Sequence, residues 1–527
     1  MTRFSRDAAL SRLADEHFDL LVVGGGITGA GVALDAASRG LHTALVERSD
    51  FASGTSSKSS KMVHGGLRYL NQRDYRLVYE ALHERQRLLR NAPHLVKPLP
   101  FLIPLYGGKT IARALNSALW MYDITGGVRI GKRHHRLSPD DTIGHMPTLR
   151  RDGLAAGFEY YDARADDARL TLTIARTAVV DHGAVAANYA GVTELLKAGN
   201  GQVVGARVAD IEVRARVVVN ATGVWSDHLR ALDEGPHSAS LRPAKGIHLS
   251  VPWERVRCDI AVVIPVLKDK RSIFVVPWGD RVYVGTTDTD YEGSLDDPVC
   301  TAEDVTYLLD AVNRFLTHPL STDDVLGTWA GLRPLVRDAH SDRTADLSRR
   351  HTVRRSPGGL VTVTGGKLTT YRRMAQDAVD EIVEVVGRGG RCRTAHLRLR
   401  GAAGFEEVAD EHLASRYGSD ARTVQAMVAA DPSLGAPLVP SLPYVRAEAV
   451  YAARYEMAHT LTDVLARRTR ALLLARDETA AAAEDAARLV AGELGWDEDE
   501  AGRQAAAFRA LAEAERKAAG LPQTVAV

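Results

Sequence analysis

A glycine-rich turn at residues 24–29 (GGGITG) constrains the fold of this chain more than any other feature. It follows an apolar run at residues 18–23, which predicts a buried strand, and it precedes small apolar residues at helical spacing. In a G-x-G-x-x-G turn, Gly24 permits the tight bend, Gly26 lets the backbone approach a pyrophosphate and Gly29 lets helix and strand pack closely. The pattern predicts that the start of the helix binds a dinucleotide; the alternative is a purely structural turn.

Further segments indicate a parallel sheet around this turn. Residues 41–47 predict a second strand that ends at Glu47, an acid placed to accept hydrogen bonds from ribose hydroxyls. Residues 214–227 and 359–375 each read as a strand followed by glycine and then helix, as expected for returns to the same sheet. Two β-rich runs at 271–287 around a Gly-Asp pair predict an antiparallel hairpin. The expected fold class is α/β: a discontinuous, doubly wound (Rossmann-like) domain with an inserted antiparallel α+β substrate domain.

Length and local composition divide the chain further. At 527 residues it is too long for one hydrophobic core. From about residue 400 onward alanine, glutamate and arginine at helical spacing replace β-branched residues, which predicts a helical C-terminal cap domain. The boundaries we expect are 16–90, 165–240 and 345–390 for the nucleotide-binding domain, 91–164 and 241–344 for the substrate domain, and 395–520 for the helical domain.

Charge and cysteine content argue against several classes of protein. A formal net charge of +1 gives no reason to expect a nucleic-acid partner. Cys258, Cys300 and Cys392 stand far apart without a metal-ligand or disulfide pattern, as is typical of a reducing compartment. There is no secretory signal and no apolar run long enough to span a bilayer, so we expect a cytoplasmic chain that meets a membrane only at its surface.

Two late glycine turns favour FAD over NAD as the dinucleotide. Residues 220–223 (NATG) and 365–367 (GGK) would bring distant chain segments to the far end of an elongated, two-headed cofactor, a need that a nicotinamide enzyme does not have. The second turn precedes a helix, whose backbone N–H groups could lie near the flavin pyrimidine, where negative charge develops on reduction. NAD is the alternative that the residues leave open.

Residues 56–70 (SSKSSKMVHGGLRYL) form a polar loop in which serines, glycines and cations occur together without apolar periodicity. Such a loop could line a flavin and present Arg68 and Tyr69 to an anionic substrate. The alternative is a solvated surface loop whose cations have no particular role. Composition alone does not separate these two interpretations.

Together these segments resemble the FAD-dependent, quinone-linked glycerol-3-phosphate dehydrogenase family. The resemblance runs from about residue 18 to residue 380, and a helical stretch at 444–470 resembles the family's C-terminal cap. HGGLRYL, GLRPL and GGKLTTYR in succession carry it, because the glycine turn alone occurs in many flavoproteins. The implied activity is oxidation of sn-glycerol 3-phosphate to dihydroxyacetone phosphate by hydride transfer from C2 to flavin N5.

The resemblance also assigns roles to individual residues. The catalytic and substrate-binding residues it implies are His248, Arg333, Lys367, Arg68, Tyr69 and Arg349. With the motifs above, the expected cofactor-binding residues are Gly24, Gly26, Gly29, Glu47, Ser57, Ser59, Lys61, Gly223, Gly366, Lys367, Leu368 and Thr369. Arginine forks suit a phosphate dianion, for which Arg349 is the candidate. The base stays open between His248 and Arg333: histidine has the more suitable pKa, and arginine is better suited to stabilise the alkoxide.

The sequence constrains the electron acceptor and the partners less. Residues 109–122 predict an amphipathic helix that could lie in a membrane interface, close to a quinone pool, or pack as an ordinary surface helix. The resemblance implies a membrane quinone as acceptor, peripheral attachment to the inner face of the bacterial cell membrane, and a homodimer. The alternatives are a soluble oxidase that passes electrons to oxygen and a flavin-fold binding protein without catalysis.

Overall fold

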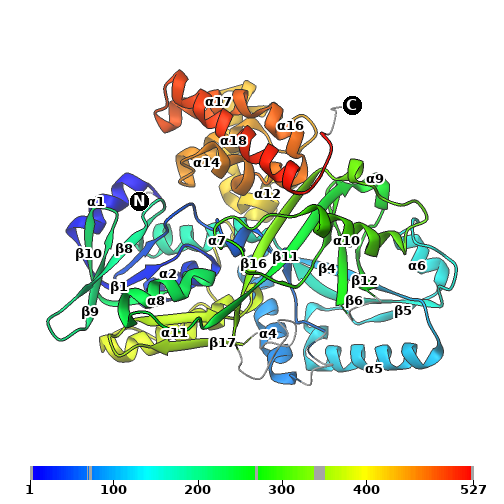
Figure 1. Ribbon diagram of the computed structural model, residues 1–527, viewed down its shortest axis with the longest axis horizontal. Coiled ribbons are helices and arrows are strands. Elements are labelled where there is room, and N and C mark those ends of the chain that lie inside the picture. Colours follow the sequence, from blue (N-terminus) through cyan, green and yellow to red (C-terminus); the bar gives the residue numbers. More distant parts are fainter. Residues whose placement is uncertain (1–3, 68, 70–73, 267–270, 338–349, 524–527) are drawn as a thin grey trace.

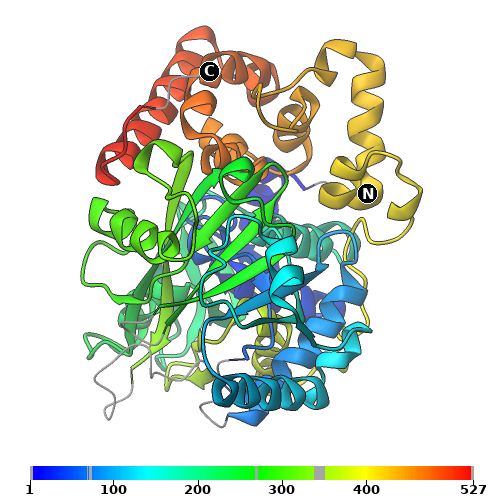
Figure 2. The same ribbon diagram turned by 90° about the vertical axis from the view of Figure 1, so that its right-hand side faces the viewer.

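The computed structural model describes residues 4–67, 69, 74–266, 271–337 and 350–523 of the chain. Two sheets lie next to each other, and a layer of C-terminal helices covers one end of the molecule (Figures 1 and 2). The predicted fold class is confirmed: a discontinuous, doubly wound domain, an inserted α+β domain and a helical C-terminal domain.

The first sheet is the doubly wound one. Its strands are β1 (His17–Val23), β2 (Thr43–Val46), β7 (Val185–Ala187), β8 (Val192–Lys197), β9 (Val203–Val208), β10 (Ile211–Asn220), β17 (His351–Arg355) and β18 (Val361–Gly365). Their order is β17-β18-β10-β1-β2-β7, with β9 and β8 added beside β10. Neighbouring strands from β18 to β7 are parallel, as the strand and glycine pattern predicted.

Helices cover both faces of this sheet, which explains the apolar run in β1. The helices are α1 (Arg6–Asp15), α2 (Ile27–Ser38), α7 (Asp167–Arg176), α8 (Ser226–Glu234) and α11 (Tyr371–Val386). Leu20 and Val22 pack in a core with α2, α7 and α11, whereas Leu21 and Val23 pack in the core that includes α1 and α8. Because successive side chains alternate between two buried faces, the consecutive positions 20–23 are all apolar.

The second sheet has ten strands and carries the inserted domain. They are β3 (Met62–Val63), β4 (Lys97–Leu105), β5 (His135–Leu137), β6 (Ala156–Arg164), β11 (Leu241–Pro252), β12 (Ala261–Val266), β13 (Arg271–Trp278), β14 (Arg281–Gly285), β15 (Thr289–Asp290) and β16 (Gly327–Val336). The predicted hairpin is confirmed, because β13 and β14 pair in antiparallel register. The sheet is antiparallel except at β4 and β12, which run parallel.

Helices also flank the second sheet. They are α4 (Tyr75–Asn91), α5 (Lys109–Thr125), α6 (Pro139–His145), α9 (Trp253–Val256) and α10 (Ala302–Asn313). The core on one face includes residues of α9 and α10, and the core on the other includes residues of α4 and α5. The amphipathic helix predicted at 109–122 is therefore present as α5, with one side in this second core.

The C-terminal domain is helical, as predicted. Its helices are α12 (Glu411–Tyr417), α13 (Ala421–Ala430), α14 (Arg446–Tyr455), α15 (Ala471–Leu474), α16 (Arg476–Ala481), α17 (Ala483–Leu494) and α18 (Glu498–Ala518). A turn of π-helix, η11 (Asp463–Arg468), brings the chain back from the domain core toward the two sheets. This return places several buried arginines against the nucleotide-binding domain.

Candidate functional site

Two adjoining cavities lie between the two sheets. The larger has a volume of about 400 Å³ and the smaller a volume of about 190 Å³. The two adjoin, because eight residues line both: Ile27, Thr55, Ser56, Pro334, Gly365, Gly366, Lys367 and Leu368. The larger cavity follows the carboxyl ends of β1, β2 and β10, which is where ligands bind in doubly wound sheets.

The glycine turn borders the larger cavity. Gly24 has a φ of +110°, and a side chain there would meet the carbonyl oxygen of Ala221 at 2.6 Å, so the turn packs directly on the end of β10. Gly26 is the N-cap of α2, and it lines the cavity together with Ile27, so the positive end of the helix faces the space. Gly29 does not line the cavity; it lets α2 pack against the carbonyl oxygen of Gly24.

Glu47 follows β2 and lines the same cavity. Its carboxylate accepts hydrogen bonds from the backbone N–H of Gly25 at 2.6 Å and of Ser49 at 2.9 Å. Burial raises the pKa of Glu47, and these two N–H groups oppose part of that rise. The carboxylate is therefore fixed beside the glycine turn, where its remaining lone pairs can accept hydrogen bonds from ribose hydroxyls.

Two later turns border the cavity from other segments of the chain. Gly223 follows β10 with a φ of +61°, and open space lies where its side chain would be. Gly365 ends β18 and Gly366 follows it, with φ values of +74° and +81°, and a short helix, η7 (Leu368–Thr370), then leads into α11. Such φ values favour glycine. Three distant turns thus meet at one elongated cavity, and their backbone groups fit an extended dinucleotide.

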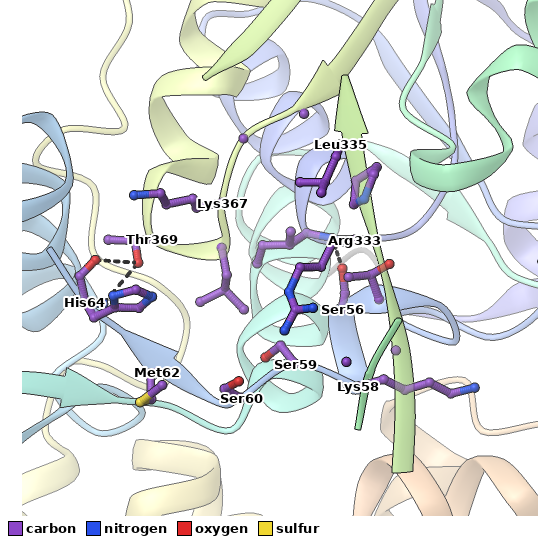
Figure 3. A pocket seen from close by; sticks show the side chains of 18 of the residues that line it. Ser56, Lys58, Ser59, Ser60, Met62, His64, Arg333, Leu335, Lys367 and Thr369 are labelled. Carbon is purple, nitrogen blue, oxygen red and sulfur yellow. Dashed lines mark hydrogen bonds between the residues drawn. The ribbon is translucent and has the colours of Figure 1, made fainter. Parts of the chain in front are cut away.

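The smaller cavity brings together residues that are far apart in the sequence (Figure 3). The predicted site residues that line it are Ser59, Tyr69, His248, Arg333, Gly366, Lys367, Leu368 and Thr369. Figure 3 shows Arg333 pointing into this space above Ser59 and Ser60. Cations, a histidine and serines from four segments therefore surround one volume next to the dinucleotide cavity.

His248 lies on β11 and is almost completely buried. Its Nε2 is 2.9 Å from Ser60 Oγ, and its ring stacks on that of Trp329 with centroids 4.8 Å apart. Nδ1 has no hydrogen-bond partner among the described residues. Burial lowers the pKa of His248 well below 6.5, and the charges of Lys61 and Arg333 lower it further. The imidazole is therefore neutral at pH 7 and able to accept a proton.

Arg333 lies on β16 and is held in a fixed orientation. One guanidinium nitrogen donates to Asp288 Oδ1 at 3.2 Å, and the other donates to Thr286 Oγ1 at 3.1 Å. A side chain at Gly246, on the neighbouring strand β11, would come within 2.5 Å of the guanidinium, so glycine makes room for it. The arrangement keeps a positive charge in the cavity at a defined position.

Lys367 and Thr369 connect the late glycine turn to the polar loop. Lys367 Nζ lies 3.8 Å from the centroid of the Tyr69 ring, a cation–π contact. The backbone N–H of His64 donates to Thr369 Oγ1 at 3.1 Å, and this hydroxyl donates to the His64 carbonyl at 3.3 Å (Figure 3). The loop that composition alone could have placed in solvent therefore lies against the cavity.

Comparisons with known proteins agree with this geometry. A family model described as FAD dependent oxidoreductase matches residues 19–372, and one described as the C-terminal domain of alpha-glycerophosphate oxidase matches residues 368–501. The chain is 42% identical to glycerol-3-phosphate dehydrogenase 2 of Mycobacterium tuberculosis, over 99% of this chain and 92% of that protein. The chain belongs to the FAD-dependent glycerol-3-phosphate dehydrogenase family.

More distant family members extend the comparison. Human mitochondrial glycerol-3-phosphate dehydrogenase is 38% identical over 94% of this chain and 73% of its own length. The crystal structure of a Bacillus halodurans glycerol-3-phosphate dehydrogenase complexed with FAD has a TM-score of 0.79 and 32% identity, covering 99% of this chain and 98% of that one. FAD is thus the cofactor, and the glycine turns, Glu47 and the helix N-terminus described above are the groups that fit it.

Some predicted residues of this FAD-dependent oxidoreductase lie elsewhere. Ser57 and Lys61 line neither cavity: the Lys61 ammonium donates to the Ser57 carbonyl at 3.2 Å and lies 3.3 Å from Asp167. Burial lowers the pKa of Lys61 to about 8. These contacts place both residues in a layer behind the cavity wall. Arg68 and Arg349 lie outside the described residues and stay predicted substrate ligands.

Sequence reasoning missed several cavity neighbours of this family member. Ser60, which lies in the polar loop at 56–70, contacts His248, and Asp288, which follows the predicted hairpin at 271–287, contacts Arg333. Trp329 precedes Arg333 by four residues on β16, so the two share a strand face. The sequence could have predicted this shared face once a strand was assigned there. The stacking of Trp329 on His248, in contrast, depends on the register of β11 and β16.

The described residues of this family member show little sign of metal, disulfide or membrane-spanning features. Among the described residues, no three His, Cys, Asp or Glu side chains are grouped so that they could hold a metal ion. The three cysteines are free thiols. Within the described part of the chain, no helix combines the length and apolarity needed to cross a membrane.

Proposed function

We propose that this chain oxidises sn-glycerol 3-phosphate to dihydroxyacetone phosphate, with hydride transfer from C2 to N5 of FAD, and that the electrons pass to a membrane quinone. One observation carries the proposal: a neutral, buried histidine and a charged arginine line a small cavity that adjoins the dinucleotide cavity and shares eight lining residues with it. The names of the mycobacterial and human relatives support the choice of substrate.

FAD, when bound in the larger cavity, supplies the hydride acceptor. The chain's own residues handle the proton and the charge. His248 takes up the proton of the C2 hydroxyl through Ser60: the Ser60 hydroxyl gives its proton to His248 Nε2, to which it is hydrogen-bonded, and accepts the substrate's proton in exchange. Arg333, fixed by Asp288 and Thr286, stabilises the negative charge that develops on the substrate oxygen. The stacked Trp329 keeps water away from the histidine.

An anaerobic half-reaction tests the substrate. FAD-loaded protein mixed with glycerol 3-phosphate is expected to lose its visible flavin absorbance rapidly, whereas glycerol, which lacks the phosphate, leaves the absorbance unchanged. Reoxidation by a soluble quinone analogue faster than by oxygen, without hydrogen peroxide, is expected for a quinone-linked enzyme. Unchanged absorbance with glycerol 3-phosphate in protein shown to contain FAD would reject the substrate, and rapid peroxide formation would favour the oxidase.

Replacement of Arg333 by glutamine is expected to lower kcat/KM on the order of 100-fold, because a fixed donor to the developing oxyanion is lost. Steady-state kinetics with an artificial acceptor measures this loss. Arg242→Gln is the matched control: Arg242 lies on the adjacent strand β11 and pairs with Asp290, as Arg333 on β16 pairs with Asp288, but it lines neither cavity. Equal losses in the two variants would mean that sheet stability, and not oxyanion binding, explains the effect.

Helix α5 and the segment after it support a membrane-bound acceptor. Exposed apolar side chains gather there: Ile111, Trp120, Met121, Ile124 and Val128. Between residues 109 and 137 the sequence has six lysines and arginines and one acidic residue, Asp123, which is buried and paired with His134. An apolar face with a tryptophan and a basic rim fits an anionic lipid surface. In Figure 1, α5 lies at the end of the molecule opposite α18.

Ile124→Glu is expected to weaken binding to anionic lipid vesicles on the order of 10-fold, because the exposed isoleucine would no longer insert. Co-sedimentation with vesicles of anionic and of zwitterionic lipids measures the binding. Leu511→Glu is the control, since Leu511 is exposed on α18 at the opposite end of the molecule and the change in charge is the same. Wild-type protein that fails to bind anionic vesicles, or equal loss in both variants, would contradict the role of α5.

A further inference from the structure

Residues 57–61, called the strap below, form hydrogen bonds with neighbouring residues through almost all of their polar groups. Asp167 accepts hydrogen bonds from the backbone N–H of Ser59 at 2.9 Å and from its hydroxyl at 2.7 Å. The Trp329 indole donates to the Ser59 carbonyl at 3.2 Å, and the Tyr283 hydroxyl donates to the Ser60 carbonyl at 2.9 Å. After Ser57, which ends a short 3-10 helix, the strap has no regular secondary structure, and these contacts with its neighbours hold it in place.

The strap in turn defines the surroundings of His248. Ser60 Oγ is the hydrogen-bond partner of its Nε2, and the Lys61 ammonium lies 4.6 Å from the centroid of the Trp329 ring that stacks on the histidine. The titratable and charged groups that face His248 are Lys61, Arg333 and the Tyr283 phenol. Displacing the strap would therefore change the hydration of the imidazole and move the charge of Lys61.

One residue of the C-terminal domain reaches the strap. Arg470 follows η11, is 1% exposed and has a φ of +66°, so its backbone turns sharply between η11 and α15. Its guanidinium donates to the Ser57 carbonyl and to Asp167 Oδ1, the latter at 3.0 Å. Asp167 is the same carboxylate that holds Ser59 and Lys61.

The charges in this contact depend on one another. Arg470 and Lys61 are buried cations that share Asp167, and Asp166 lies 3.6 Å from Arg470. Burial, followed by the charge of Arg470, lowers the pKa of Lys61. Removing one partner from a buried group of paired charges leaves the others without compensation. Loss of the Arg470 guanidinium would therefore disturb Asp167 and with it the strap.

We propose that Arg470 is a positioning residue through which the C-terminal domain fixes the strap and keeps His248 dry. It acts through Asp167 and Ser57 and touches neither cavity. The inference rests on the proposed function in one respect, because it takes His248 to be the base. Through Arg470 the C-terminal domain would thus influence the reaction by positioning the strap, although this residue lines neither cavity.

Arg470→Gln, with Arg176→Gln as control, tests the proposal. Arg176 is also a buried arginine at the border of the C-terminal domain, where it donates to the Tyr451 hydroxyl at 3.0 Å and pairs with Asp420, but it contacts neither the strap nor the cavities. For Arg470→Gln we expect kcat to fall on the order of 10- to 100-fold with little change in KM, because the base is misplaced while Arg333 is not.

The pH profile separates positioning from simple destabilisation. Water admitted beside His248 would raise its pKa toward 6.5, so the acid limb of kcat/KM should move to higher pH in Arg470→Gln and stay in place in Arg176→Gln. Arg470→Lys, which keeps the charge near Asp167, should recover part of kcat. An acid limb that moves equally in both variants, or in neither, would overturn the proposal.

A measurement without catalysis keeps this inference distinct from the proposed function. Hydrogen–deuterium exchange of the FAD-loaded full chain should show faster exchange in a peptide containing residues 57–61 for Arg470→Gln only, whereas Arg176→Gln should show it around residue 451. Unchanged exchange in the strap of Arg470→Gln would refute the proposal even if the enzyme is active. Inactive wild-type protein would reject the proposed function but leave this test of the strap valid.

Discussion

Replacement of His248 by glutamine is expected to lower kcat about 1000-fold, because the side chain can keep a hydrogen bond to Ser60 but cannot take up a proton. Rapid-mixing measurement of flavin reduction gives the rate directly. In the wild-type protein the rate of flavin reduction should fall with decreasing pH only below pH 6.5, because burial lowers the pKa of His248 and keeps the imidazole neutral down to that range. The variant should not show this fall.

His94→Gln is the matched control for this variant. His94 is 1% exposed, burial lowers its pKa to about 4, and it lines neither cavity. The activity of His94→Gln therefore shows how much is lost when a buried, neutral histidine that lines neither cavity is replaced. If both variants lose activity to the same extent, or if His248→Gln stays active, His248 is not the base and Arg333 becomes the candidate.

The same buried histidines make stability depend on pH in a defined direction. The pKa values of His248 and His94 in the folded state lie below 6.5, so between that value and the folded pKa the unfolded chain binds more protons than the folded chain. The free energy of unfolding should therefore decrease as pH falls below 6.5, as denaturant titrations at several pH values would measure.

Gly29→Ala is expected to yield protein without FAD. Alanine favours a helix by about 1 kcal/mol over glycine, so propensity alone predicts a small gain in stability. The new Cβ, however, would be 1.9 Å from the carbonyl oxygen of Gly24, a separation that no packed atoms adopt. Because α2 or the glycine turn must shift, the geometry that presents Gly26 to a pyrophosphate is lost. The FAD content of the purified protein, measured from its absorbance spectrum, tests this.

Gly492→Ala makes the same chemical change in another helix. Gly492 lies in α17, and no atom lies within 4 Å of the position that its Cβ would occupy. This variant should keep its FAD and unfold at the same or a slightly higher temperature. Full FAD content in Gly29→Ala would contradict this prediction, because it would mean that α2 and the glycine turn can accommodate a Cβ at position 29.

The sequence alone was sufficient where local chemistry decides the structure. Residues 18–23 are apolar except for Asp19 because β1 is buried on both faces, and the spacing of Gly24, Gly26 and Gly29 reflects steric contacts within one strand–turn–helix unit. The late turn at Gly365 and Gly366 needs positive φ values, which also points to glycine from local geometry. These features predicted the doubly wound sheet and the region of the dinucleotide cavity.

Only the tertiary structure decided how the residues of the smaller cavity are arranged. His248 and Ser60 are 188 residues apart, and Arg470 lies 303 residues from Asp167, so no local pattern could predict these contacts. The pKa of His248 depends on burial and on the charges of Lys61 and Arg333, which different elements supply. Lys61 in the loop motif likewise turned out to lie behind the cavity wall. Sequence determined which residue types are present, whereas desolvation and remote charge, which exist only in the folded chain, determined what they can do.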